Sequence, residues 1–365
     1  MGEVNRRYKR VVVKIGSNVL TTPNGTLDMD RIAALTDQVA RLYRAGVEVI
    51  MVSSGAVASG RSQITPRVKR LDSVAARQLF SAVGQAKLIN RYYDLFAGYD
   101  IVCGQVLTTK ESLSTRMHYL NQRNCMGVML ENGVVPIINE NDTISVTELM
   151  FTDNDELSGM VATMMGADAL FILSNIDGIY SGDPSDPRSE VIRRVEGGTE
   201  SVSKYISTTK SQFGRGGMLT KCKIACKVAD EGVEVVIANG KRDDILCDLI
   251  LDGKDLVCTR FTPSTKPISD IKKWIAHSDG FAKGELHINE GAYEALMRDK
   301  ATSLLPVGVS RVEGVFAKDD IVKIISPDGD NIGVGRVGVS SDRARKIIGE
   351  KGHKAIVHYD YLYLE

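Results

Sequence analysis

The sequence is poor in the residues that build metal centres and disulfide frameworks. Its six cysteines are scattered and include no C-x-x-C pair, and its five histidines form no H-E-x-x-H motif. In a chain of 365 residues, this usage indicates reduced thiols in a cytoplasmic protein. We therefore expect no zinc site, no metal held by protein ligands and no disulfide framework.

Long apolar segments are also missing. The longest apolar runs, such as residues 134–138 and 169–173, fall far below the ~18 residues that a membrane helix needs. The first ten residues contain basic side chains but no apolar segment, which is unlike a secretory signal. We expect neither a membrane partner nor secretion.

The chain lacks a net charge. Lys and Arg total 46, as do Asp and Glu, and residues 1–260 hold 31 of each sign. Residues 261–282 hold three basic and two acidic side chains, and residues 283–365 hold twelve and thirteen. A protein that coats nucleic acid through its overall potential is strongly basic. The charge balance excludes that class, and nucleic acid is not an expected partner.

The first 240 residues alternate short apolar runs with longer helical patterns. Because strands buried on both faces are apolar throughout, this alternation predicts a mainly parallel sheet covered by helices, an α/β three-layer sandwich. The predicted strands are residues 10–15, 47–52, 101–107, 134–138, 169–173 and 234–238. The predicted helices are residues 30–45, 73–96, 115–131, 156–165 and 218–231.

The pattern changes after residue 252. Pro263 and Pro267 lie in a polar stretch, and short turn-rich runs begin at residue 284, one of them at 301–305. We predict a first domain over residues 1–260, a linker over 261–282 and a small, mostly-β domain over 283–365. A G-x-G-x-x-G match at 333–338 lies in this late β region, so it reflects glycines at bulges or tight corners and not a dinucleotide loop.

Small and polar residues follow five of the predicted strands. Because ligands bind beyond the carboxyl ends of strands in open α/β sheets, these residues predict a site at one sheet edge. They are Lys14, Gly16 and Ser17, Ser53 to Gly55, Asn139 to Asp142, Ser174 and Asn175, and Asn239 and Gly240.

Two basic elements could meet phosphate at this edge. Lys14 precedes a Gly-Ser turn, and a lysine there supplies a compact positive charge, although a strand-end lysine that reaches solvent is the alternative. The glycine-rich residues 214–217 lead into a helix that carries Lys221 in its first turns. The chain has no G-x-x-x-x-G-K-[ST] loop. The glycine loop alone is weak evidence.

The third element is acidic and amide-rich. Residues 139–142 and 153–155 can form turns and helix caps, and at least one of them is expected to do so. Their functional interpretation is that amides and carboxylates bind the ammonium of a small substrate and orient the lysines. Kinases need this combination, because phosphoryl transfer depends mostly on positioning and charge neutralisation.

Taken together, these motifs resemble the glutamate 5-kinase branch of the amino acid kinase family. The tail from GELHINEG (284–291) resembles the PUA domain that many members of this branch carry. The motifs are VVVKIGSNVL (11–20), VSSGAVASG (52–60), INEND (138–142), DND (153–155), GIYSGDP (178–184) and GRGGMLTK (214–221).

The resemblance implies transfer of the γ-phosphoryl group of ATP to the side-chain carboxylate of L-glutamate, the first step of proline biosynthesis. Lys14 and Lys221 match the lysines that stabilise the transferring group, and Asp155 matches the residue that positions them. Mg²⁺ is implied to arrive with ATP. The implied glutamate-binding residues are Ser54, Asp142, Asn154 and Asn139. The implied nucleotide-binding residues are Lys14, Ser174, Asn175, Arg215, Gly216, Gly217, Met218, Leu219, Thr220 and Lys221.

The resemblance leaves alternatives open. Asn175 stands where the family usually has Asp, and Arg215 stands where it usually has a small residue. Both departures concern the contacts with ATP and not the reaction.

The resemblance also implies a homo-oligomer and feedback inhibition by proline. Residues 59–77 are the candidate lid or sensing loop for this inhibition. A kinase for acetylglutamate, aspartate or a nucleoside monophosphate is the alternative within the fold. An RNA-binding protein is the alternative outside it, through a basic patch of Arg343, Arg345 and Lys346 that a solvated helix face explains better.

Overall fold

The chain folds into two compact units, residues 1–267 and 268–365. Their division falls inside the segment predicted as the linker. The computed structural model describes residues 7–65, 71–113, 115–144, 154–184, 186–196, 217–265, 274–275, 278, 281–298 and 302–364.

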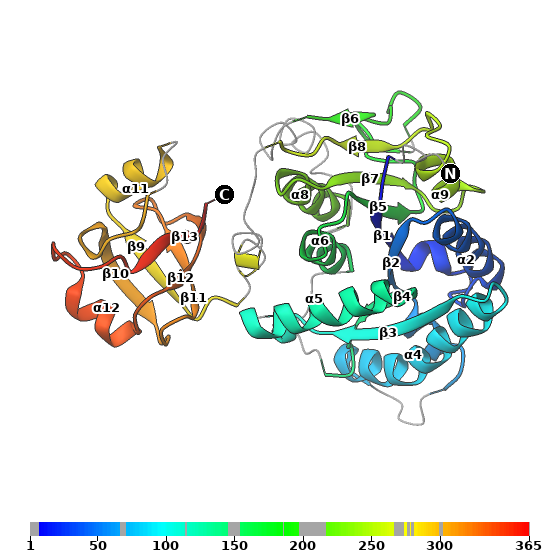
Figure 1. Cartoon of the computed structure of the whole chain (residues 1–365), viewed down its shortest axis with the longest axis horizontal. Helices are drawn as coiled ribbons and strands as arrows, with labels where there is room; N and C mark the ends of the chain where they lie inside the picture. The colour runs from blue at the N-terminus through cyan, green and yellow to red at the C-terminus, as the bar shows by residue number, and fades with distance from the viewer. Residues whose placement is uncertain are drawn as a thin grey trace. The chain divides into compact units, whose positions relative to one another are not determined.

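The first unit is built on a sheet whose described strands run in the order β3-β4-β2-β1-β5-β7-β8-β6 (Figure 1). Neighbouring strands are parallel, except that β8 runs antiparallel to β7. The six predicted strands are confirmed, whereas the short β6 and β8 carry no clear pattern in the sequence. The strands are β1 (Arg10–Ile15), β2 (Glu48–Ser53), β3 (Val102–Thr108), β4 (Val134–Glu140), β5 (Ala169–Ser174), β6 (Arg194–Val195), β7 (Glu234–Asn239) and β8 (Thr259–Phe261).

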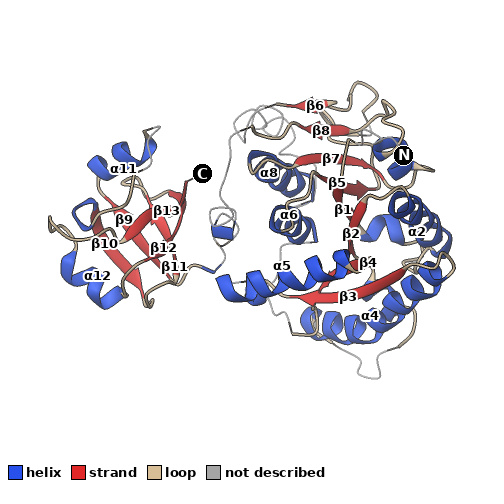
Figure 2. Cartoon of the chain, viewed as in Figure 1, coloured by secondary structure: helices blue, strands red, loops and turns tan. Residues whose placement is uncertain are grey.

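Helices cover both faces of this sheet, so the predicted three-layer sandwich is confirmed (Figure 2). The helices α5, α6 and α8 lie on one face, and α2, α4 and α9 lie on the other (Figure 1). The described helices are α1 (Ser17–Leu20), α2 (Met29–Arg44), α3 (Ala56–Arg61), α4 (Ser73–Ala97), α5 (Arg116–Glu131), α6 (Asn154–Met164), α8 (Gly217–Asp230) and α9 (Ile245–Ile250), with a 3₁₀ turn at Glu111–Leu113. None of the helices in the described part of the chain has an apolar stretch long enough to cross a membrane.

Local sequence explains where the long helices begin and which face they bury. The side chain of Asp28 accepts from the Arg31 backbone N–H at 3.0 Å, and Asp72 accepts from the Ala75 N–H at 2.8 Å, so both residues cap a helix. One apolar stripe of α2 is fully buried against the sheet. It consists of Ile32, Leu35, Val39 and Leu42.

The segment predicted as a lid or sensing loop, residues 59–77, is only partly a loop. Residues 59–61 continue α3 and residues 73–77 begin α4, while residues 66–70 lie outside the described residues. The two helices cross in backbone contact, because a Cβ on Gly84 would lie 1.9 Å from the carbonyl oxygen of Ala56. A loop spanning all of residues 59–77 is therefore wrong, since both ends of the segment are helical, while its role as a lid or sensing segment stays a prediction.

The second unit contains a five-stranded sheet in the order β10-β9-β11-β12-β13, and its described residues include the helices α11 and α12. The mostly-β expectation is confirmed, but the run at 301–305 forms no strand in its described part, residues 302–305. There Leu304 makes only an isolated bridge to Val357. The elements are β9 (Gly284–Ile288), α11 (Glu290–Met297), a 3₁₀ turn at Pro306–Gly308, β10 (Val309–Gly314), β11 (Ile321–Ile325), β12 (Asn331–Val337), α12 (Ser341–Ile347) and β13 (Val357–Leu364).

The glycines at 333–338 serve the packing of this sheet. A Cβ on Gly333 would lie 2.2 Å from the carbonyl oxygen of Tyr363, and one on Gly335 would lie 2.5 Å from Cγ1 of Val357. The register between β11 and β12 also shifts at this end. Close strand contact and an irregular register thus account for the motif, as predicted.

Candidate functional site

The centre of the candidate site is a buried carboxylate that binds two lysines. Asp155, in the first turn of α6, is fully buried, and its Oδ2 lies 2.6 Å from Nζ of Lys221 in α8. Its Oδ1 pairs with Nζ of Lys14. Lys14 is only 5% exposed, so the alternative of a strand-end lysine that reaches solvent is wrong. Three residues far apart in sequence are thus joined into one charged group.

Strand geometry explains why Lys14 reaches Asp155. Side chains alternate across a sheet, and Val13 and Ile15 pack into the core on the α2 side. Lys14 therefore points to the opposite face, where α6 packs against β1. Gly16 leaves room beside the lysine, because a Cβ there would lie 3.6 Å from Lys14 Nζ and 3.3 Å from the carbonyl oxygen of Leu173.

The charge state of Asp155 follows from its partners. Burial disfavours the ionised form and by itself raises the pKa of this carboxyl group. The adjacent Lys14 and Lys221 ammonium groups outweigh burial and hold the pKa of Asp155 below its ordinary value. The site therefore holds an ionised carboxylate whose role is to fix two cations.

Three residues predicted to bind the substrate form a hydrogen-bonded group beside this centre. The amide nitrogen of Asn154 donates to Ser54 Oγ and to Asn139 Oδ1, both at 2.9 Å. Asn154 and Asp155 are consecutive in α6, so the two groups share one helical turn. Ser54 follows β2 and Asn139 ends β4, which places all three residues at the carboxyl edge of the sheet.

Asp142, the fourth residue predicted to bind the substrate, has a partner that the sequence does not indicate. Arg77 donates from Nε to Asp142 Oδ1 at 2.8 Å and also lies 3.3 Å from Oε2 of Glu140. Both carboxylates are nearly buried. Arg77 lies in the second turn of α4, far from any motif, so no local pattern marks it as part of the site.

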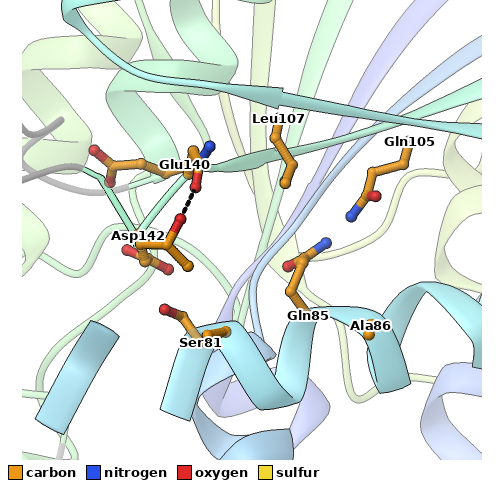
Figure 3. A pocket seen from close by; sticks show the side chains of 10 residues that line it. Ser81, Gln85, Ala86, Gln105, Leu107, Glu140 and Asp142 are labelled. Atoms are coloured by element: carbon orange, nitrogen blue, oxygen red, sulfur yellow. Dashed lines mark hydrogen bonds between the residues drawn. The ribbon is translucent and has the colours of Figure 1, made fainter. Parts of the chain in front are cut away.

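A cavity of about 280 Å³ adjoins Asp142 (Figure 3). Its floor is α4, with Ser81 and Gln85, and its opposite wall is β3, with Gln105 and Leu107. Glu140 and Asp142 line the remaining end. The cavity has both apolar and polar lining side chains, is acidic at one end and is of a size that suits a small metabolite.

The predicted nucleotide side is described in part. Ser174 ends β5 and is nearly buried, Asn175 is exposed, and Met218 and Thr220 are half-buried in α8. Helix α8 begins at Gly217 and contains Leu219. Arg215 and Gly216 lie outside the described residues, as does Asp153 of the DND motif.

A polar cluster that was not predicted from the sequence lies at the same carboxyl edge of the sheet. Asp177 Oδ1 accepts from Asn239 Nδ2 at 3.2 Å and pairs with Arg242 at 2.9 Å. These residues follow or end β5 and β7, and the half-buried Arg242 is paired with Asp177 there. Asn239 was already among the strand-end residues, so its position is the signal that could have found the cluster.

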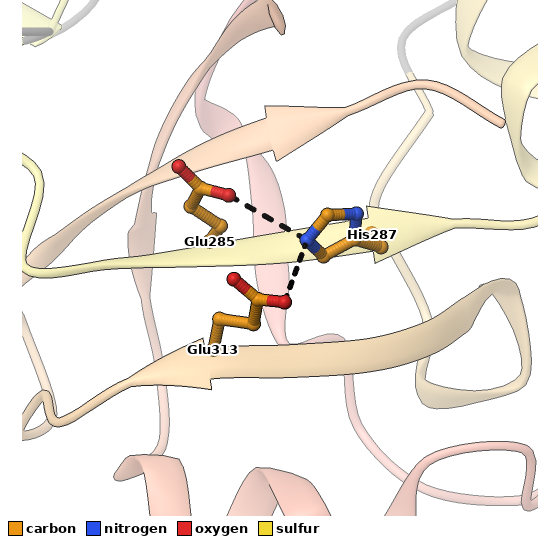
Figure 4. Close-up of side chains that lie close together, drawn as sticks. All are labelled: Glu285, His287 and Glu313. Atoms are coloured by element: carbon orange, nitrogen blue, oxygen red, sulfur yellow. Dashed lines mark ion pairs between the residues drawn. The ribbon is translucent and has the colours of Figure 1, made fainter. Parts of the chain in front are cut away.

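In the second unit, Glu285, His287 and Glu313 place potential metal ligands within 4.8 Å of one another (Figure 4). Arg311 Nη2 lies 3.1 Å from His287 Nε2 and 2.9 Å from Glu313 Oε1. A guanidinium already occupies the open side of Glu313 and His287, so the group is an ion-pair cluster on the sheet surface. Of the basic residues of α12, Arg345 is likewise engaged, since it pairs with Asp342 at 3.5 Å, whereas Arg343 and Lys346 are exposed.

Comparisons with known proteins agree with this architecture. A family model described as the amino acid kinase family matches residues 9–239, and a PUA domain model matches residues 284–359. The chain is 64% identical to the glutamate 5-kinase of Bacteroides thetaiotaomicron over 99% of this chain and 100% of that protein. It is 48% identical to the glutamate 5-kinase of Chlorobaculum tepidum over 98% of each. UMP kinase from Bacillus anthracis is similar with a TM-score of 0.48 and 15% identity, covering 71% of this chain and 97% of that one, a likeness too weak to bear on function.

Proposed function

The chain belongs to the amino acid kinase family, and we propose that it transfers the γ-phosphoryl group of ATP to the side-chain carboxylate of L-glutamate. The product is L-glutamyl 5-phosphate, the first intermediate on the route to proline. The observation that carries the proposal is the pair of lysines on Asp155, directly beside the hydrogen-bonded group of Ser54, Asn139 and Asn154.

The reaction needs positive charge more than it needs acid or base. A carboxylate oxygen of glutamate forms a bond to the γ-phosphorus while the bond to the β,γ-bridging oxygen breaks and ADP leaves. No proton moves in this step, but an anion attacks an anion. Lys14 and Lys221 offset the repulsion and stabilise the charge on the transferring group. Asp155 orients both lysines and does not touch the reacting atoms.

The glutamate pocket in this proposal is formed by four residues, which are Ser54, Asn139, Asp142 and Asn154. Asn154 and Asp142 supply oxygens for the α-ammonium group, and Ser54 and Asn139 complete the polar wall. Arg77 contacts both Glu140 and Asp142, so one cation orients the two carboxylates at this end of the pocket.

ATP lies against the carboxyl end of β5 and the start of α8 in this proposal. Ser174, Asn175 and the start of α8 lie on this side, and the α8 N-terminus favours phosphate. Residues 215–221 remain the nucleotide contacts that the resemblance implies. Mg²⁺ would arrive with ATP and would supply positive charge that offsets the charge of the phosphates. The Asp155 oxygens already bind lysines, so this carboxylate does not fit the role of a metal ligand.

Trapping of the acyl phosphate tests the proposal. The protein is incubated with ATP, Mg²⁺, L-glutamate and hydroxylamine, and γ-glutamyl hydroxamate is measured. Acetylglutamate and aspartate replace glutamate in parallel reactions, and UMP is tested by the release of ADP, because its product UDP gives no hydroxamate. We expect product with glutamate only. Product with another acceptor, or none with glutamate from folded protein, contradicts the assignment.

Three finer expectations belong to the same proposal. Proline has a cationic amine beside a carboxylate, as glutamate does, so we expect it to compete for the glutamate pocket. We also propose a homo-oligomer in the cytoplasm, with domains at residues 1–260 and 283–365 joined by 261–282. Unchanged activity at millimolar proline contradicts the first expectation, and a monomer by light scattering contradicts the second.

A further inference from the structure

A glutamine outside every sequence motif contacts the proposed glutamate pocket. Gln85 lies in α4 and lines the cavity beside Asp142, opposite Gln105 (Figure 3). Its Oε1 accepts a hydrogen bond from Nδ2 of Asn139 at 2.8 Å. Asn139 is 4% exposed, so water contributes little to satisfying its amide.

This contact sets the orientation of two amides in succession. A side-chain amide has a donor at one end and an acceptor at the other. Because Asn139 Nδ2 faces Gln85, its Oδ1 faces Asn154 and accepts from Asn154 Nδ2 at 2.9 Å. The same nitrogen donates to Ser54 Oγ at 2.9 Å. Gln85 therefore begins a chain of hydrogen bonds that ends at Ser54.

The orientation matters for what the pocket offers a ligand. With its nitrogen committed to Asn139 and Ser54, Asn154 presents its oxygen as the acceptor for an ammonium group. Ser54 Oγ accepts from Asn154, so its own proton can be donated to a carboxylate. An amino acid needs this combination of one acceptor and one donor. A reversed Asn139 amide would turn its nitrogen toward that of Asn154.

Helix α4 holds Gln85 in a fixed position. The preceding residue, Gly84, lies so close to α3 that a Cβ would meet the Gly60 nitrogen at 2.3 Å. Helix α3 directly follows Ser54 and Gly55. The first and last members of the hydrogen-bonded chain are thus carried by two elements in backbone contact, which limits their relative movement.

We infer that Gln85 is a positioning residue for glutamate: it fixes the amide orientations of Asn139 and Asn154 without touching the substrate. The inference rests on the proposed function, because it assigns a role within that pocket. It predicts an effect on the KM for glutamate, while the KM for ATP is unaffected.

Two substitutions distinguish the loss of the Gln85 hydrogen bond from a change in the size of the side chain. Gln85→Met keeps the length of the side chain and removes the acceptor, so the KM for glutamate should rise about ten-fold, the cost of one buried hydrogen bond to a group left unpaired. Gln85→Glu keeps an oxygen that accepts from Asn139, and its KM should stay within about three-fold of the wild-type value. The KM for ATP should change less than two-fold in both, on the order of experimental scatter.

The control is Gln38→Met in α2, where Oε1 of Gln38 accepts from the Leu246 backbone N–H at 2.8 Å, outside the site. It should lower the melting temperature without changing either KM. The inference is wrong if Gln85→Met leaves the KM for glutamate unchanged, or if Gln85→Met and Gln85→Glu raise it equally. If the wild-type protein makes no glutamyl hydroxamate, the proposed function fails first and this inference with it.

Discussion

Arg77 binds the carboxylate of Asp142, with Nε 2.8 Å from Oδ1. The arginine comes from α4 and the aspartate from the segment after β4, so the pair connects the α2-side helix layer to the sheet edge. Glu140 lies 3.3 Å from the same guanidinium. One cation thus orients two nearly buried carboxylates, one of which is proposed to receive the substrate ammonium.

Removal of this guanidinium should weaken glutamate binding. We expect Arg77→Ala to raise the KM for glutamate about ten-fold, because Asp142 loses its charge-assisted hydrogen bonds and its fixed orientation. Arg91→Ala is the matched control, since Arg91 lies on the same helix in an exposed pair 3.7 Å from Asp94. A lower KM in Arg77→Ala would mean that the arginine competes with the substrate instead.

The two lysines should determine turnover. Lys14→Met and Lys221→Met should each lower kcat by about 10²- to 10³-fold, the effect of losing one preorganised charge at the transition state. The fold should persist by circular dichroism. Lys223→Met is the control, because Lys223 is exposed on the same helix as Lys221. Near-normal kcat in either lysine variant would remove that residue from the charge-stabilising role.

Stability should depend on Asp155 in a defined pH range. Its pKa is lowered in the folded state, so between the folded and unfolded pKa values the unfolded state binds more protons. The contribution is complete above the ordinary aspartate pKa of about 3.9 and is lost as pH falls through the folded pKa. Asp155→Asn should cost about 3 kcal/mol at pH 7, the scale of breaking a buried ion pair.

Urea unfolding at a series of pH values tests this. The difference in unfolding free energy between wild type and Asp155→Asn should be constant at neutral pH and shrink below about pH 4. Asp94→Asn, at an exposed helix position, serves as the control. A difference that stays constant down to pH 2 would contradict the ionised state of Asp155.

The contact between α3 and α4 should tolerate no added atom. A Cβ on Gly84 would lie 1.9 Å from the Ala56 carbonyl oxygen, so Gly84→Ala should destabilise the fold by about 3 kcal/mol. Gly127→Ala in α5 is the opposite case, because nothing lies within 4 Å of its Cβ position. It should stabilise by up to about 1 kcal/mol through helix propensity. Thermal unfolding distinguishes the two, and equal melting temperatures would contradict the close contact.

The sequence predicts the sheet and the charged centre because both have local signals. Buried parallel strands are apolar throughout, and Lys14 interrupts one of them. Arg77 and Gln85 could not be predicted, because they lie within an ordinary helical pattern and reach the site only through the packing of α4. The run at 301–305 contributes only a single bridge at the buried Leu304, while Leu305 is exposed.

The most direct test of the central claim follows one oxygen atom. The protein is given ATP, Mg²⁺, hydroxylamine and L-glutamate labelled with ¹⁸O in its side-chain carboxylate. A carboxylate oxygen that attacks the γ-phosphorus stays with that phosphorus when hydroxylamine cleaves the acyl phosphate. We predict one ¹⁸O atom in each phosphate released with the hydroxamate. Phosphate free of ¹⁸O would contradict attack by the glutamate side chain.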